Sequence, residues 1–389
     1  MAGMVLPDYE GGSIANLMST IAAARGGEPG PYAPLRELPV TSLASTRTVI
    51  LLVIDGLGFN QLRRNCAGST LEQHTIGALT SVFPSTTASA VTTLMTGLAA
   101  QQHALTGWHM YLRELGAVVA VLPCRTRAGE IPFAPQDVPP AGLFTCVPVF
   151  DRVATPSSIV APDDIVDSAY SLAHGGRAAR RGYRTAEEMC DAIVALARGG
   201  VGRRFVYAYF PGIDSLAHRH GIASRAVAAE FARLDGAFAR LLQRLRGSDS
   251  CVIVTADHGF VDVEPQGWTD LEAHPRIAET LSQPLCGEPR VAYCYVRPGM
   301  REQFESAVSD ELGERFELHA SADLVARGYF GSGAANARLA DRVGDYTLIA
   351  RGRFALRDRL PGERRHVQIG VHGGLSDDEM RVPLIVARA

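Results

Sequence analysis

The amino-acid sequence predicts an α/β fold: a doubly wound, mainly parallel sheet with helices on both faces and an inserted cap. Three observations predict it. Continuous apolar runs of strand length each stop at a turn-forming residue, amphipathic helical patterns lie between these runs, and two long stretches break the alternation. Strands that alternate with helices are typical of parallel sheets, and the irregular stretches are the natural places for a cap.

Three apolar runs, at residues 48–54, 204–210 and 251–256, are expected to form central strands. In each run, apolar and β-branched side chains follow one another with little polar alternation, which is typical of a strand buried on both faces. A shorter apolar run at 381–387 is expected to return to the sheet as its last strand.

Two segments between these strands show helical periodicity. Thr185 and Glu188 have the spacing of a capping box and open an apolar-periodic segment that reaches residue 197. From residue 224 to 246, apolar residues recur every three or four positions and form one helical face. Both segments are expected to be helices.

The stretches at 109–145 and about 262–365 are richer in Pro, Gly and Arg and have weaker periodicity. They are interpreted as excursions from the sheet, the second of them large enough to form a cap. The chain is therefore expected to have a catalytic α/β core at 1–261, a cap at 262–365 and a return to the core at 366–389.

The bulk composition excludes several classes of function. The chain has 389 residues, of which 47% are apolar and 20% charged, and its formal net charge of −3 gives no reason to expect nucleic acid or an anionic membrane as a partner. The longest apolar run is far shorter than the roughly 20 residues that cross a bilayer, and the first residues lack the pattern of a secretory signal. Seven scattered cysteines, never spaced C-x-x-C, argue against a disulfide framework or a thiolate zinc site. These features predict a cytoplasmic protein.

Acidic residues stand where the predicted strands end. Asp55 and Asp257 directly follow two of the strands, and Asp214 comes shortly after the third. In open α/β sheets, ligands bind beyond the carboxyl ends of the strands, so these side chains are candidates for one site. The alternative is that each aspartate only forms a turn.

Three histidines accompany these acids. His218 lies four residues after Asp214, so a helix would bring both side chains to one face, and His258 directly follows Asp257. His372 stands in a glycine-rich loop, where the backbone can pass close to a ligand. A solvent-facing pair or a simple loop residue is the alternative for each. Taken together, oxygen and imidazole donors suit Zn²⁺ or Mn²⁺, and six ligands are enough for two ions about 3.5–4 Å apart.

The segment FPSTTASAVTTLMTG, residues 83–97, holds seven serine or threonine residues. Pro84 favours an extended approach to a helix that runs to about Met95, which would place Thr87 in the first helical turn. A hydroxyl there faces unpaired backbone N–H groups and the positive end of the helix dipole. The alternative is that Ser85, Thr86 and Thr87 are N-caps.

The order of these motifs resembles the alkaline phosphatase superfamily, and within it the type I phosphodiesterase/nucleotide pyrophosphatase family. The motifs are strand–Asp-Gly, a Ser/Thr-rich helix start that ends in Thr-Gly, D-x-x-x-H, strand–Asp-His-Gly and a late His-Gly, and together they span residues 46–387. Members of this superfamily place their nucleophile ten residues before the glycine of the Thr-Gly pair. Counting back from Gly97 gives Thr87, with Thr86 as the second choice.

The resemblance implies a phosphoesterase with two divalent metal ions, zinc before manganese, that acts on a small-molecule phosphoester through a phosphothreonine on Thr87. It also implies the ligand sets. One ion would be held by Asp214, His218 and His372, and the other by Asp55, Asp257 and His258 together with the Thr87 oxygen.

Two positions depart from the pattern of relatives. Alkaline-phosphatase-type monoesterases carry a glutamate for a third ion five residues before the D-x-x-x-H aspartate, where this chain has Tyr209. Nucleotide pyrophosphatases carry a phosphate-binding asparagine about twenty residues past the nucleophile, where this chain has Trp108. The first departure favours diesters over monoesters, and the second weakens nucleotide specificity. Trp108, His109 and Tyr111 are expected as substrate contacts, with packing under the cap as the alternative for Tyr111.

Other functions stay open from the sequence. The same metal core would support a phosphomonoesterase or a phosphonate hydrolase, and a non-catalytic metal-binding protein could retain the fold. A sulfatase is disfavoured because the chain has no C-x-P-x-R motif.

Overall fold

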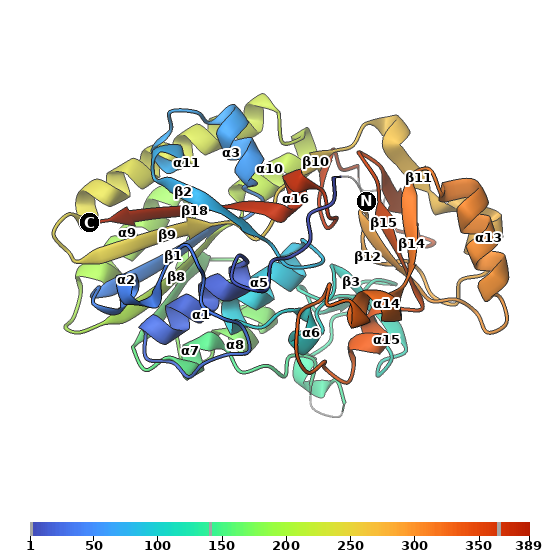
Figure 1. The fold of residues 1–389 in the computed structure, drawn as a ribbon, viewed down its shortest axis with the longest axis horizontal. Coiled ribbons are helices and arrows are strands. Elements are labelled where there is room, and N and C mark those ends of the chain that lie inside the picture. Colours follow the sequence, from blue (N-terminus) through green and yellow to red (C-terminus); the bar gives the residue numbers. More distant parts are fainter. Residues whose placement is uncertain (1–2, 140–141, 364–366) are drawn as a thin grey trace.

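The computed structural model describes residues 3–139, 142–363 and 367–389. Its central sheet has seven strands in the order β2-β18-β9-β1-β8-β6-β7 (Figure 1). Their bounds are β1 (Thr48–Ile54), β2 (Thr75–Thr80), β6 (Ser157–Pro162), β7 (Ala179–Tyr183), β8 (Arg204–Phe210), β9 (Ser250–Thr255) and β18 (Arg381–Arg388). β1 pairs in parallel with β8 and β9, and β6 pairs in parallel with β7 and β8, whereas β18 is antiparallel to β9 and β2. The predicted mainly parallel sheet is confirmed.

The pairing register of the central strands brings their carboxyl ends together, next to the predicted site. Every residue of β1 is buried, as its unbroken apolar sequence predicts. Val53 pairs with Thr255 of β9, and Ile54 pairs with Phe210 of β8. The carboxyl ends of the three strands therefore meet at one edge of the sheet, and the segments that follow them begin side by side.

Helices cover both faces of this sheet (Figure 1). One layer contains α3 (Phe59–Asn65), α4 (Thr70–Gln73), α9 (Ala186–Arg198), α10 (Gly212–His220) and α11 (Arg225–Leu245). The other contains α1 (Ile14–Ala24), α2 (Val40–Ala44), α5 (Thr87–Thr96), α7 (Val149–Arg152) and α8 (Ala169–Gly175). α9 begins after Thr185, whose side chain accepts a hydrogen bond from the Glu188 amide, and α11 begins after the N-cap Ser224. Both helices predicted from the sequence are present.

A second seven-stranded sheet stands beside the first, in the order β14-β15-β13-β12-β3-β4-β5. Its strands are β3 (His109–Leu112), β4 (Ala117–Ala120), β5 (Arg125–Thr126), β12 (Cys286–Glu288), β13 (Val291–Cys294), β14 (Phe316–Ala320) and β15 (Tyr346–Ala350). The helices of this region are α6 (Ala100–His103), α12 (Pro275–Ala278), α13 (Arg301–Leu312), α14 (Ser321–Ala326) and α15 (Leu339–Val343). The two stretches interpreted as separate excursions thus supply strands to one sheet.

Short pairs and turns connect the two sheets. They are β10 (Val261–Asp262) with β17 (Gly370–Val371), β11 (Trp268–Asp270) with β16 (Ala355–Arg357), α16 (Asp377–Met380), and the 3-10 helices Pro135–Asp137, Pro265–Gly267 and Leu271–Ala273. The division into core and cap at residues 261 and 365 stays a prediction, and its second boundary falls at residues 364–366, outside the described residues.

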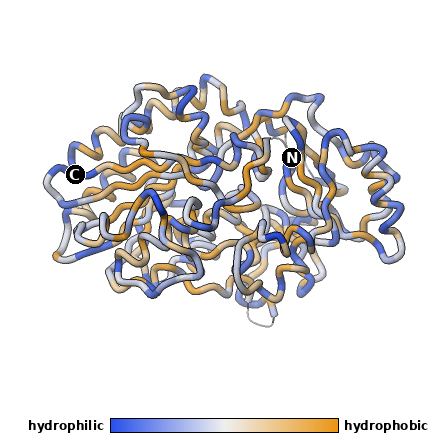
Figure 2. Tube along the Cα trace, in the orientation of Figure 1, coloured by the Kyte–Doolittle hydropathy of each residue, from blue (hydrophilic) through white to orange (hydrophobic). Residues whose placement is uncertain are grey.

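Apolar side chains concentrate in the strands of both sheets, as the hydropathy colouring shows (Figure 2). A separate apolar cluster lies between the sheets and includes Phe83, Tyr293 and Phe330. The ring centroids of Phe83 and Phe330 are 5.0 Å apart in an edge-to-face arrangement. Because Phe83 precedes α5 by four residues, this cluster fixes the segment that leads into that helix against the second sheet.

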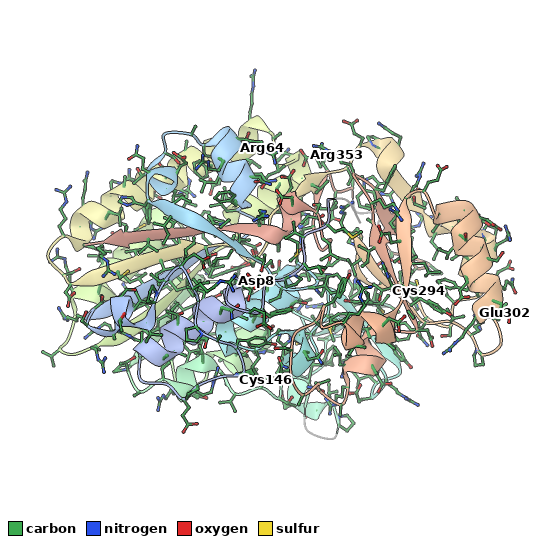
Figure 3. All side chains as sticks on the ribbon, in the orientation of Figure 1. Asp8, Arg64, Cys146, Cys294, Glu302 and Arg353 are labelled. Carbon is green, nitrogen blue, oxygen red and sulfur yellow. The ribbon has the colours of Figure 1, made fainter. Side chains whose placement is uncertain are left out.

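All seven cysteines are free thiols, and Cys146 and Cys294 lie in different parts of the molecule (Figure 3). Among the residues that the structure describes, no helix is both long and apolar enough to cross a membrane.

Candidate metal centre and active site

The three predicted aspartates converge at the carboxyl edge of the central sheet. Asp55 follows β1, Asp257 follows β9, and Asp214 lies in the first turn of α10, which begins two residues after β8. His218 is one turn later in α10, and His372 directly follows β17. With His258 these residues form what is called here the carboxylate–histidine cluster.

One half of the cluster surrounds His258. Its Nε2 atom lies 3.4 Å from Asp55 Oδ1 and 3.5 Å from Asp257 Oδ2. The same nitrogen lies 3.2 Å from the hydroxyl oxygen of Thr87. The ligand atoms of the two aspartates and the histidine fit together around one position for a metal ion.

The other half surrounds Asp214. Its Oδ1 atom lies 3.3 Å from His218 Nε2 and 3.9 Å from His372 Nε2. The ring of His372 stacks on the ring of His258, with centroids 3.6 Å apart. Because ligand atoms of Asp214, His258 and His372 lie within 4.8 Å of one another, the two halves adjoin.

All three histidines present Nε2 to the cluster because Nδ1 is engaged elsewhere. Nδ1 faces a backbone carbonyl in each case, at 2.9 Å from Gly370 O for His218, 3.1 Å from Gly259 O for His258 and 3.3 Å from Ser85 O for His372. A carbonyl beside Nδ1 favours the tautomer with a proton there, which leaves the Nε2 lone pair free to bind a metal.

Three carboxylate oxygens of the cluster are buried without a hydrogen-bond partner: Asp55 Oδ1, Asp214 Oδ1 and Asp257 Oδ2. These are the oxygens that face the histidine Nε2 atoms. Burial, with the nearby charges of Asp214 and Asp257, raises the pKa of Asp55 well above its ordinary value. Burying charged oxygens without partners is costly, and a divalent cation would remove that cost. The donor set therefore fits Zn²⁺ or Mn²⁺.

Tyr209 supports Asp55 from β8. Its hydroxyl donates a hydrogen bond to Asp55 Oδ2, the oxygen that does not face His258. The position to which the resemblance assigns a glutamate in monoesterases therefore holds, in this chain, a tyrosine that orients a carboxylate of the cluster. The sequence showed the absence of that glutamate but gave no sign of this hydrogen bond.

Replacing Tyr209 by phenylalanine is expected to weaken the affinity of the cluster for Zn²⁺ by about 10–100-fold, because Asp55 loses the partner that orients it. Metal titration of the apoprotein measures this change. Tyr207, two residues earlier in β8, is a matched control, since its buried hydroxyl has no hydrogen-bond partner in the described structure. Equal Zn²⁺ affinity in the Tyr209→Phe and Tyr207→Phe variants would contradict the role given to Tyr209.

The three consecutive hydroxyls at the start of α5 face three different partners. Ser85 donates to the Gly374 carbonyl at 2.7 Å, and Thr86 donates to Glu288 Oε1 at 2.5 Å. Only the Thr87 hydroxyl faces the carboxylate–histidine cluster. Thr86 is the N-cap of α5, but its side chain makes no capping hydrogen bond, and Thr87 is the first helical residue.

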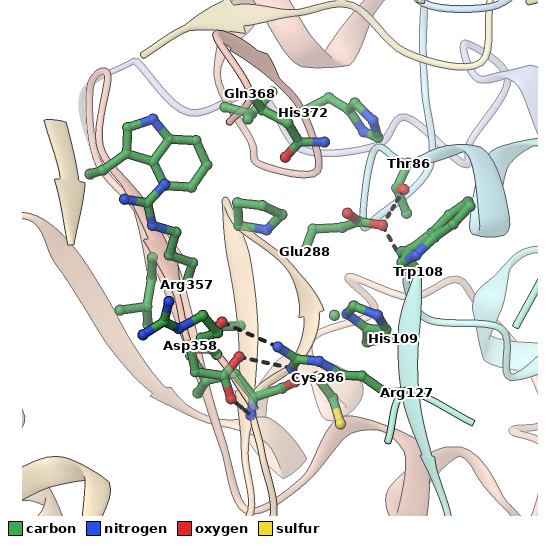
Figure 4. Close-up of a pocket in the computed structure, with 18 of the residues that line it drawn as sticks. Thr86, Trp108, His109, Arg127, Cys286, Glu288, Arg357, Asp358, Gln368 and His372 are labelled. Atoms are coloured by element: carbon green, nitrogen blue, oxygen red, sulfur yellow. Dashed lines mark hydrogen bonds and ion pairs between the residues drawn. The ribbon is translucent and has the colours of Figure 1, made fainter. Parts of the chain in front are cut away.

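A cavity of about 510 Å³ opens onto the cluster. Thr86, Thr87, Trp108 and His109 line it, together with residues of the second sheet (Figure 4). Of the substrate contacts predicted from the sequence, Trp108 and His109 lie here, and the side chain of Trp108 is exposed. Tyr111 does not line the cavity, because it lies two residues further along β3, where its ring packs edge-on against Tyr295 at 5.2 Å. The structure thus places Tyr111 against Tyr295 and outside the lining of this cavity, and a substrate contact at Tyr111 stays a prediction.

Glu288, at the end of β12, is a cavity residue that sequence reasoning missed. Its Oε1 accepts hydrogen bonds from the Thr86 hydroxyl and, at 2.7 Å, from the Trp108 backbone N–H (Figure 4). Burial raises the pKa of Glu288 to about 7, against the opposing effect of these hydrogen bonds. No local pattern marks this residue, since only the pairing of the two excursions brings it beside Thr86.

The family model for type I phosphodiesterase/nucleotide pyrophosphatase matches residues 49–125 and 166–375, which include all six members of the carboxylate–histidine cluster and Thr87. The chain belongs to this family. The protein is therefore a hydrolase that acts on phosphoester bonds.

Solved structures share the fold. Murine ectonucleotide pyrophosphatase/phosphodiesterase 5 is 16% identical, with a TM-score of 0.66 over 86% of this chain and 87% of that one. An inactive threonine-to-alanine form of the same murine protein, in complex with AMP, gives a TM-score of 0.65 at 16% identity over 86% of this chain and 87% of that one. Phosphonoacetate hydrolase from Sinorhizobium meliloti 1021, in complex with phosphonoformate, gives 0.63 at 16% identity over 88% and 90%. No protein of curated function matches the sequence significantly.

Proposed function

We propose that this family member is a metal-dependent phosphodiesterase or nucleotide pyrophosphatase that acts through a phosphothreonine on Thr87. The observation that carries the proposal is the position of the Thr87 hydroxyl, 3.2 Å from His258 Nε2 at the edge of a cluster of buried carboxylates and imidazoles. The neighbouring hydroxyls of Ser85 and Thr86 are bound to other groups, which favours Thr87 over Thr86.

Two divalent ions, zinc before manganese, are proposed to bind the cluster. Asp55, Asp257 and His258 would hold one of them with the Thr87 oxygen, and Asp214, His218 and His372 would hold the other. When bound, such a pair of ions neutralises charge on the phosphoryl oxygens and lowers the pKa of a coordinated hydroxyl or water.

Thr87 begins the first step by attacking phosphorus in line with the ester bond. A bond forms between the Thr87 oxygen and phosphorus, the bond to the leaving alcohol breaks, and the alcohol departs with the proton that the Thr87 hydroxyl gave up. Thr87 is the first residue of α5, so unpaired backbone N–H groups and the positive end of the helix stabilise the negative charge of the phosphoryl group.

Water completes the reaction in a second displacement. Its oxygen bonds to phosphorus, the bond to the Thr87 oxygen breaks, and Thr87 recovers a proton. Two in-line displacements give net retention of configuration at phosphorus. The AMP complex of the inactive threonine-to-alanine form of the murine structural relative supports both the nucleotide-like substrate class and the choice of a threonine.

Phosphonate or phosphomonoester hydrolysis is the second candidate function. The similarity to phosphonoacetate hydrolase favours it, because a comparable fold carries that activity. A non-catalytic metal-binding role is the least supported, since the Thr87 hydroxyl lies beside two adjoining groups that contain five of the six proposed ligands, and the sixth, His218, contacts Asp214.

Metal removal tests the proposal. Metal-replete protein is expected to hydrolyse bis-p-nitrophenyl phosphate faster than p-nitrophenyl phosphate, and a chelator should abolish both activities because the carboxylate–histidine cluster alone cannot neutralise the phosphoryl charge. Adding back Zn²⁺ or Mn²⁺ should restore turnover. Turnover that survives complete chelation, with metal loss verified by elemental analysis, would exclude the proposed chemistry.

A further inference from the structure

Glu288 holds a carboxylate beside the proposed nucleophile, and that carboxylate is no part of the carboxylate–histidine cluster. Its Oε1 is bound by two neutral donors, the Thr86 hydroxyl and the Trp108 backbone N–H. Its Oε2 has no hydrogen-bond or ion-pair partner among the described residues, and the residue lines the cavity. The charge of Glu288 is therefore directed into the substrate space without a counter-ion.

Close packing fixes the position of this carboxylate. Thr86 is the immediate neighbour of Thr87 in the chain. On the other side, a Cβ atom placed on Gly373 would lie only 2.7 Å from the Glu288 Cβ, so the side chain packs directly on the loop that carries His372. Glu288 is thus held between the residue that precedes the nucleophile and the residue that follows a metal ligand.

The other carboxylates of the described cavity lining, apart from the cluster, each have an arginine partner. Each arginine that lines the cavity is bound to a carboxylate: Arg127 to Asp358 at 2.8 Å and Glu363 at 3.0 Å, Arg357 to Asp270, and Arg359 to Glu272 at 3.3 Å. The sequence contains no lysine. Outside the carboxylate–histidine cluster, Glu288 is therefore the one carboxylate of the described lining that has no arginine partner.

We propose that Glu288 is a specificity residue that selects substrates with a singly charged phosphoryl group and rejects doubly charged ones. The inference rests on the proposed function and gives a physical reason why the enzyme would prefer phosphodiesters to phosphomonoesters. A phosphodiester carries one negative charge at phosphorus and a phosphomonoester two, so a fixed carboxylate nearby repels the monoester more strongly, by an amount that grows in a water-poor site.

The backbone N–H of Trp108 contributes to the same selectivity. This N–H, next to the Thr86 hydroxyl on the same carboxylate oxygen, donates its hydrogen bond to Glu288. A donor that could have bound a second phosphate charge is thereby engaged.

The test compares Glu288→Gln with the natural protein on two substrates that share one leaving group, p-nitrophenyl phosphate and methyl p-nitrophenyl phosphate, at one alkaline pH. Glutamine can still accept hydrogen bonds from Thr86 and Trp108, so only the charge is lost. The ratio of kcat/KM for the monoester to that for the diester is expected to rise roughly tenfold. Inhibition by inorganic phosphate is expected to strengthen in parallel, which provides a binding measurement independent of turnover.

Glu272→Gln is the matched control, because Glu272 lines the same cavity but is paired with Arg359. Its ratio should stay close to that of the natural protein. An unchanged ratio in Glu288→Gln, or an equal rise in Glu272→Gln, overturns the role of Glu288 while leaving the proposed function intact. Failure of the natural protein to hydrolyse the diester overturns the proposed function itself.

Discussion

Replacing Thr87 by alanine is expected to lower turnover of phosphodiesters by at least about 10³-fold while leaving the bound metal nearly unchanged. The variant removes the oxygen that would form the covalent intermediate, but it keeps the six side chains that would hold the ions. The hydroxyl is the only one of the three at the start of α5 that faces the carboxylate–histidine cluster. Steady-state kinetics and elemental analysis on the same preparation measure both effects.

Thr86→Val is the matched control for that experiment. It removes the second candidate hydroxyl one residue away and keeps a β-branched side chain of similar size at the same helix start. Its diesterase activity should stay within about tenfold of the natural protein, since Thr86 contacts Glu288 and not the cluster. Loss of turnover in Thr86→Val together with near-full activity in Thr87→Ala would reverse the assignment.

The sequence predicts those elements whose burial shows as a regular pattern of apolar residues along a single segment. The run at 48–54 is apolar throughout because β1 is buried on both faces, and the helix at 225–245 carries its apolar stripe on the face that is buried in the core. Element ends are less certain: β9 begins and ends one residue before the predicted 251–256. A pattern averaged over several residues cannot locate a single terminal hydrogen bond.

The second sheet could not be predicted from local sequence patterns, because neighbouring strands in it come from segments that are far apart in the sequence. β3 and β12 meet through one residue pair, His109 with Gly287, that joins segments about 180 residues apart in sequence. Its strands are mostly short, so each carries little periodicity of its own. The sequence therefore identified two irregular stretches but could not show that they form one sheet.

The residues of the site also fall into two groups, those that a sequence motif marks and those that it does not. The aspartates, histidines and Thr87 stand at strand ends and at a helix start, positions that sequence motifs mark directly. Tyr209 and Glu288 act through side-chain contacts between distant elements and carry no such mark. The groups expected to do the chemistry were therefore predictable, whereas the groups proposed to orient and select were not.

A buried ion pair joins the second sheet to the loop that carries His372. Arg290, in the turn between β12 and β13, is 1% exposed, and Glu379 in α16 is fully buried. The guanidinium donates two hydrogen bonds to the carboxylate, at 3.1 and 2.9 Å. Glu379 also accepts a hydrogen bond from the Gly374 amide at 2.8 Å, two residues after His372. This pair therefore holds the loop that carries His372 against the turn that follows Glu288.

Replacing Arg290 by methionine is expected to lower the free energy of unfolding by about 3–5 kcal/mol, because Glu379 would be left as a buried charge without a counter-ion. Burial pushes the pKa of Glu379 up, but Arg290 and the hydrogen bonds outweigh it, so the net pKa is lowered. The pair therefore stabilises the fold above the ordinary glutamate pKa of about 4.3, and this contribution is lost as the pH falls through the lowered pKa of the folded state. Denaturant unfolding at neutral and acid pH measures both effects.

The double variant Arg290→Met/Glu379→Gln separates the ion pair from simple loss of packing. It removes both charges while glutamine can still accept the hydrogen bond from Gly374, so it should recover much of the stability that Arg290→Met loses. Arg184→Met, which breaks a solvent-exposed ion pair with Glu188, should leave the unfolding transition almost unchanged. If the double variant is no more stable than Arg290→Met, the cost lies in packing and not in the uncompensated charge. Metal content should follow stability through the series, because displacement of the Gly374 loop also moves His372 away from Asp214.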